Sequence, residues 1–268
     1  MSEPNSNPQP KPPVISPAAA APATPAALGE LPAERVPITN PVAAVEAILR
    51  EPRRIMFQLT QPGAGRVIAS LLLAAIGCAL VYGIVVGTFS GGEQLWAAPV
   101  KIVVGLVLSA AICMPSLYVF SCLSGSRARL ADLCGLVAGL LALAALLLLG
   151  FAPVAWVFSE STESAAGIGT IHLGFWFVAS YFGLRFLHAG FKLLDARGSG
   201  GLAAWVVVFI LVTLQMTAAL RPIVGTAPTF LPTEKKFFLS HWFDCTVGTP
   251  KEKPKTIPRA KVPSKFSS

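Results

Sequence analysis

The stretch "LCGLVAGLLALAALLLLGFAPVAWVF", residues 133–158, holds no charged side chain and is rich in leucine and alanine. A helix crosses the hydrocarbon core of a bilayer in about 20 apolar residues and satisfies its own backbone hydrogen bonds there. We therefore expect this stretch to span a membrane. Four more runs have the same character, so the predicted spans are 67–89, 100–123, 133–158, 168–184 and 202–220.

The predicted fold class is an all-α integral membrane protein, a bundle of five transmembrane helices at 62–221 with disordered termini. The loops between the runs are short, so successive helices should pack as antiparallel neighbours. The fourth run is short as written, and we expect it to continue past Arg185 through "FLHAGFKLL" with Arg185 snorkelling. Pro115 and Pro153 lie inside the second and third runs and should kink them.

The composition supports the membrane interpretation. Of 268 residues, 54% are hydrophobic and 13% are charged, whereas an ordinary soluble domain has about 25% charged residues. The net charge of +8 comes from basic residues at both ends and between the apolar runs. That distribution favours a lipid bilayer as the partner and argues against nucleic acid. Four of the five cysteines lie in apolar runs, so neither a disulfide framework nor a zinc site is expected.

Residues 1–40 form a Pro- and Ala-rich segment without an aromatic residue. Such a segment buries too little apolar surface to offset the entropy of ordering it. We expect a disordered cytoplasmic tail with polyproline II character. "PQPKPP" within it could instead dock into an aromatic groove.

Residues 41–61 read as an amphipathic juxtamembrane helix. Asn40 is a good N-cap, Pro41 suits the first helical position, and Pro52 should break the helix. An apolar stripe at helical spacing is formed by Val42, Val45, Ile48 and Leu49. Beside it, Arg50, Arg53 and Arg54 are candidate contacts to an anionic membrane surface. The equal alternative is a cytoplasmic helix that packs on the bundle.

The loop charges predict the orientation. Basic residues precede the first run and follow the second and fourth, whereas the other two loops hold no Lys or Arg. The positive-inside rule then places the N-terminus in the cytoplasm and the C-terminus outside. Eight basic residues in the C-terminal tail argue for the opposite orientation. We expect the bundle in a bacterial inner (cell) membrane.

After the last run, residues 222–247 are predicted to lie on the outer face with a short interfacial helix. Phe238, Trp242 and Phe243 share one broad face of that helix and are candidate interfacial anchors, because aromatic residues favour the membrane–water boundary. Residues 248–268 are Lys- and Pro-rich, and we expect a disordered basic tail.

Two GxxxG pairs, Gly83 with Gly87 and Gly135 with Gly139, predict close helix packing. That packing could lie within the monomer or between copies. Lys101 is expected at a span end, where a lysine can snorkel. No catalytic, nucleotide-binding or metal-binding motif occurs, so we expect no cofactor, no metal and no enzymatic activity.

The lead-in segment "ILREPRRIMFQL", the number of spans and the proline in "CMPSLYVF" give the chain a resemblance to a known family. Over about residues 45–221 the chain resembles the Yip family of five-span membrane proteins and its bacterial relatives. The resemblance implies a non-enzymatic role in membrane organisation or trafficking. We expect a binding or organising component with a membrane-protein partner or a homo-oligomer. The alternative is an accessory subunit of a transporter or membrane complex.

Overall fold

A computed structural model describes residues 27–220 except 91, 93, 127, 162–164 and 194–199. Within these residues the regular structure is entirely helical. Three short elements come first, η1 (Pro32–Arg35), α1 (Pro41–Arg50) and α2 (Pro52–Thr60). Five long helices follow, α3 (Ala64–Ser90), α4 (Gln94–Leu123), α5 (Leu130–Ser161), α6 (Ala165–Leu193) and α7 (Gly200–Ala219).

The five long helices are each long and apolar enough to cross a membrane. This confirms the predicted all-α, five-span fold class. The fourth span continues past Arg185 to Leu193, as expected. The second span begins earlier than expected, because the apolar run already starts at Leu95. The helices α4 and α5 continue through Pro115 and Pro153.

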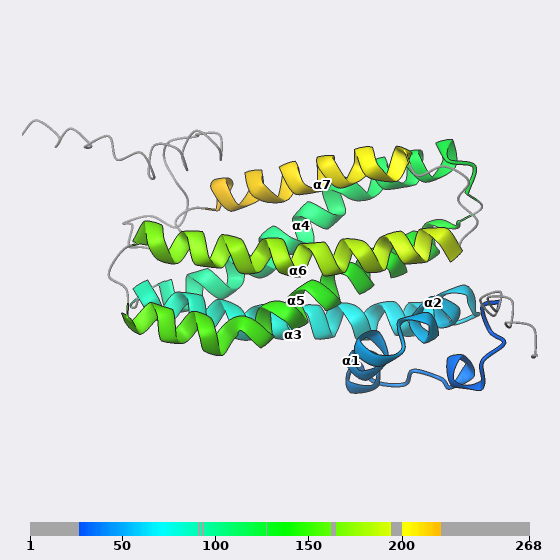
Figure 1. Ribbon diagram of the computed structural model, residues 1–268, viewed down its shortest axis with the longest axis horizontal. Helices are drawn as coiled ribbons and strands as arrows, with labels where there is room; N and C mark the ends of the chain where they lie inside the picture. Colours follow the sequence, from blue (N-terminus) through cyan, green and yellow to red (C-terminus); the bar gives the residue numbers. More distant parts are fainter. Residues whose placement is uncertain are drawn as a thin grey trace, which may run out of the picture.

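The helix α5 forms the centre of the bundle. It packs against α3 and α6, α3 packs against α4, and α4 packs against α7 (Figure 1). Both α3 and α5 bury small residues, which include Ala75, Ala79, Ala138, Ala142 and Ala145. Small side chains let helix backbones approach closely, which is the main source of packing energy inside a membrane.

Residues 27–60, which we call the N-terminal cap, pack against the first half of α3 and α5 (Figure 1). The cap marks one end of the bundle, the cap end, and α7 finishes at the opposite end, the far end. Asn40 caps α1 as predicted, because its side chain accepts a hydrogen bond from Ala43 N at 2.7 Å. The expected break at Pro52 divides the segment into α1 and α2.

One expectation about this region is wrong. The expected disordered segment is too long, because residues 27–40 carry the η1 turn and the buried side chains of Glu34 and Ile38. The expected apolar stripe of α1 is divided between a buried and an exposed face. The buried residues are Ala44, Ala47 and Ile48, whereas Val42 and Leu49 are exposed. The small alanines allow a close approach to the bundle that the larger valine and leucine would prevent.

Candidate binding surface at the N-terminal cap

The cap is organised around one buried charge. The side chain of Glu34 is 3% exposed, and its Oε1 accepts a hydrogen bond from Arg53 Nε at 2.6 Å. Its Oε2 accepts a second bond from the backbone N–H of Gly29 at 2.5 Å. The hydrogen bond from Arg53 holds the pKa of this carboxyl below its ordinary value, against the opposing effect of burial. A buried carboxylate with partners at both oxygens is the condition under which a charge is tolerated out of water.

The turn at Gly29 requires a glycine. Its φ of +93° lies in the left-handed region, and a Cβ there would come within 2.5 Å of Phe57 Cε2. The ring of Phe57, on α2, therefore covers the turn that delivers the N–H of Gly29 to Glu34. A larger side chain at this position would meet both backbone strain and a steric clash.

The polar side chains of α2 also hold the preceding backbone. Arg54 Nε donates to Val36 O at 2.9 Å. Gln58 Nε2 donates to Glu34 O and to Val36 O, both at 3.2 Å. A segment that cannot form its own apolar core is thus held by side-chain bonds to its backbone carbonyls. These bonds join residues 18 to 24 positions apart, so a composition argument on residues 1–40 alone could not find them.

Each of the three arginines predicted to contact the membrane surface has a glutamate partner. Arg53 pairs with Glu34 as described, Arg54 with Glu51 at 3.3 Å, and Arg50 with Glu46 at 3.3 Å. The Arg50 side chain is 77% exposed, whereas those of Arg53 and Arg54 are 34% and 14% exposed. Two of the three guanidinium groups are therefore used mainly to hold the cap together.

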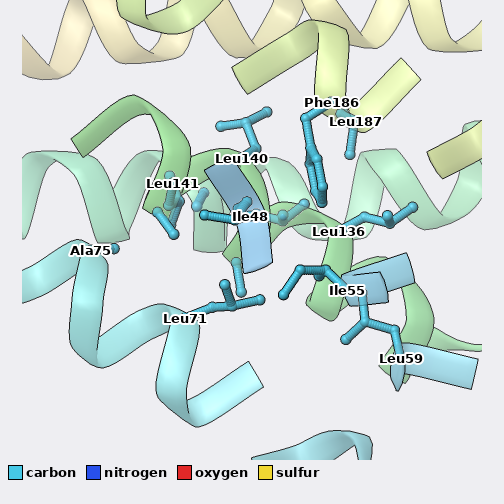
Figure 2. Packing of buried hydrophobic residues seen from close by; sticks show 14 of the residues in the cluster. Ile48, Ile55, Leu59, Leu71, Ala75, Leu136, Leu140, Leu141, Phe186 and Leu187 are labelled. Atoms are coloured by element: carbon cyan, nitrogen blue, oxygen red, sulfur yellow. The ribbon is translucent and has the colours of Figure 1, made fainter. Parts of the chain in front are cut away.

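The cap is also fastened to the bundle. A Cβ at Gly135 would collide with the side chain of Leu59, so α2 and α5 approach each other at this glycine. Figure 2 shows Leu59 and Ile55 beside Leu136 in the buried apolar cluster. Arg129, just before α5, donates to Thr60 O at 3.5 Å. The cap is therefore joined to α5 by apolar packing and by a polar contact at its edge.

Asp132 lies in the first turn of α5, at the end of the third span. Its Oδ2 accepts a hydrogen bond from the backbone N–H of Arg129 at 2.9 Å, and its Oδ1 pairs with the Arg129 guanidinium at 3.1 Å. A carboxylate in the first turn satisfies a free N–H and interacts favourably with the helix dipole. This accounts for Asp132 as a structural residue.

The glycine pairs make contacts between helices of the same chain. A Cβ at Gly83 would collide with the backbone of Pro99 on α4, and one at Gly139 would collide with the ring of Phe186 on α6. Gly135 faces Leu59, and Gly87 is buried. Three of the four glycines therefore lie where a neighbouring element approaches.

Polar groups inside the spans are joined across helices. The Tyr82 hydroxyl and His172 Nδ1 lie 2.7 Å apart and link α3 to α6. Trp205 Nε1 donates to Cys113 O at 2.9 Å and links α7 to α4. Lys101 lies two turns inside α4 and is 1% exposed, so the expectation that it snorkels at a span end is wrong. Sequence reasoning missed the Tyr82–His172 pair, because 90 positions separate the two residues.

In the part of the chain that the structure describes, no group of three or more potential metal-ligating residues occurs. The predicted interfacial anchors Phe238, Trp242 and Phe243 lie outside the described residues. No family model matches the chain, and no curated protein or solved structure matches it. Outside the five long helices, the cap is the longest segment that the structure describes, and we take it as the candidate site for binding.

Proposed function

We propose that this multi-pass membrane protein is a non-enzymatic binding or membrane-organising component, and that the N-terminal cap is the part that binds. The observation that carries the proposal is the buried Glu34–Arg53 pair, which fixes a polar segment onto α2. A surface held in one conformation loses less entropy on binding than a flexible tail does. The same role is implied by the resemblance to the Yip family.

The cap end is proposed to face the cytoplasm. Among the described residues outside the spans or in their terminal turns, the cap end carries the exposed arginines Arg35, Arg50, Arg66 and Arg129, whereas the far end carries Glu160. Cytoplasmic segments hold an excess of Lys and Arg in proteins inserted by the positive-inside rule. The proposed membrane is the inner membrane of a bacterium.

The test compares two matched variants of the full-length protein, purified gently from native membranes. Glu34→Gln removes the buried charge that holds the cap, and Glu46→Gln makes the same chemical change in the exposed pair with Arg50. We expect a stoichiometric partner to co-purify with the wild type and with Glu46→Gln, and to be lost with Glu34→Gln. The absence of any stoichiometric partner or homo-oligomer would contradict the proposal.

The alternative, an accessory subunit of a transporter or membrane complex, is supported by the sides of the bundle. In the most apolar 18-residue stretch of each helix, 28% of the stretch is buried in α4, 22% in α6 and 28% in α7, against 67% in α5. Helices of another subunit could cover these sides. A partner that stays bound to Glu34→Gln would favour this function, because the spans would then hold it. Substrate-dependent flux by the purified chain alone would contradict both functions.

A further inference from the structure

The helix α1 lies beside the spans and not beyond their ends. Figure 1 shows it alongside the first half of α3, and it contacts both α3 and α5. Its buried residue Ile48 belongs to the same apolar cluster as Leu71 and Ala75 of α3 and Leu141 of α5 (Figure 2). These residues of α3 and α5 lie within the two spanning helices, and Figure 1 shows α1 beside that part of α3.

The position of this part of α3 gives the depth of α1. The helix α3 has 27 residues, about 40 Å at 1.5 Å per residue, and a hydrocarbon core is about 30 Å thick. If α3 is centred, about 5 Å projects on each side. Leu71 and Ala75 then lie about 5 and 11 Å inside the hydrocarbon edge. Helices that lie in a membrane interface are buried by about 5–10 Å, so α1 is at that depth.

The surface of α3 at this level faces lipid. Leu73 lies between Leu71 and Ala75 in the sequence and is 61% exposed. An exposed leucine at mid-leaflet depth of a spanning helix meets acyl chains. The outward face of α1 lies at the same depth as Leu73.

The outward face of α1 has the composition that such a position requires. Val42 and Leu49 are 77% and 54% exposed, and at 100° per residue they lie within about 20° of each other around the helix. Glu46 and Arg50, whose side chains pair at 3.3 Å, lie about 40° and 80° from Val42 on one side. The exposed face therefore changes from apolar to charged around the helix.

We propose that α1 is embedded in the leaflet at the cap end. Val42 and Leu49 lie against acyl chains, and the Glu46–Arg50 pair reaches the level of the lipid head groups. Arg50 is long enough to keep its guanidinium there while its stem lies along apolar surface. The cap then contacts lipid on one side through α1 and faces water on the side of η1 and α2.

The test places a nitroxide at single cysteines of the full-length protein, with the five native cysteines replaced, in phospholipid vesicles. Val42→Cys and Leu49→Cys are the probes, Leu73→Cys is the lipid-facing control, and Gln61→Cys, in the exposed turn between α2 and α3, is the water-facing control. Power saturation measures accessibility to oxygen, which concentrates in hydrocarbon, and to a water-soluble nickel chelate.

We expect the ratio of oxygen to nickel accessibility at both probes to match Leu73→Cys and to exceed that at Gln61→Cys several-fold. The controls report in the same background that the spans have inserted. Both probes are exposed side chains, so a label there disturbs no internal packing. A ratio like that of Gln61→Cys at both positions would overturn the proposal. Low accessibility to both reagents would also overturn it, because it would show protein and not lipid against α1.

Discussion

A methyl group added at Gly83 should force α3 and α4 apart. A Cβ at this position would collide with Pro99 Cα and lie 3.0 Å from Pro99 N and 3.1 Å from Pro99 Cβ. The obstacle is backbone and a rigid ring, so no side-chain rotation can relieve it. In the same helix, a Cβ at Gly77 would meet no atom within 4 Å. Gly77→Ala is therefore a matched control for Gly83→Ala.

The magnitude follows from the difference between the two variants. Replacing glycine by alanine inside a helix raises helix propensity equally at both positions, so that contribution cancels. What remains is overpacking at Gly83, which typically costs about 1–3 kcal/mol. The free energy of unfolding of Gly83→Ala should be lower than that of Gly77→Ala by this amount. The unfolding equilibrium constants should then differ by about 5- to 150-fold.

The assay is unfolding by sodium dodecyl sulfate in mixed micelles, followed by helicity and by the reactivity of Cys113. This cysteine is on α4 and is 1% exposed, so its thiol should react only when α4 separates from its neighbours. We expect Gly83→Ala to lose protection of Cys113 at a lower detergent fraction than the wild type or Gly77→Ala. Equal midpoints for the two alanine variants would refute the reasoning, because the α3–α4 contact would then have room for a methyl group.

Three other results are expected. Trp205→Phe removes the hydrogen bond to Cys113 O and should lower the free energy of unfolding by about 0.6–2 kcal/mol; an unchanged detergent midpoint would contradict this. Because folding lowers the pKa of Glu34, the ionised carboxylate stabilises the folded protein. This stabilisation is complete above the ordinary pKa of 4.5 and is lost as the pH falls through the lower pKa of the folded state. Amide exchange in residues 27–40 should therefore accelerate in acid, after correction for intrinsic rates, and Glu34→Gln should abolish that dependence; an equal acceleration in the variant would exclude Glu34 as the titrating group. Cys245 is the one cysteine outside the apolar runs, and it follows the fifth span in the sequence. In right-side-out vesicles, an impermeant thiol reagent should label Cys245 without permeabilisation; labelling only after the membrane is opened would reverse the proposed orientation.

In the cap, local features could be predicted from the sequence, but long-range contacts could not. The N-cap at Asn40 and the break at Pro52 could be predicted, because they depend on neighbouring residues. The order in residues 27–40 could not, because it depends on Arg53, Arg54 and Gln58 reaching back to Glu34 and to carbonyl groups along the chain. Partners this far apart are brought together only when η1 lies against α2.

The same limit applies to the choice of the buried helix face and to the identity of contacting residues. Periodicity grouped Val42 and Leu49 with Ile48 in one apolar stripe, but the bundle buries Ile48 together with Ala44 and Ala47, because small side chains allow closer contact. Glycine spacing indicated close approaches without naming Pro99 as the neighbour of Gly83.

The sequence by itself determined the all-helical class, the five spans and the length of the fourth, because a bilayer requires about 20 apolar residues with internally satisfied backbone bonds. Only the tertiary structure decided that α5 is central, that the cap is folded, and which polar groups meet inside the membrane. Spanning is a property of one segment against lipid, whereas packing order depends on the shapes of two surfaces that the chain brings together from distant positions.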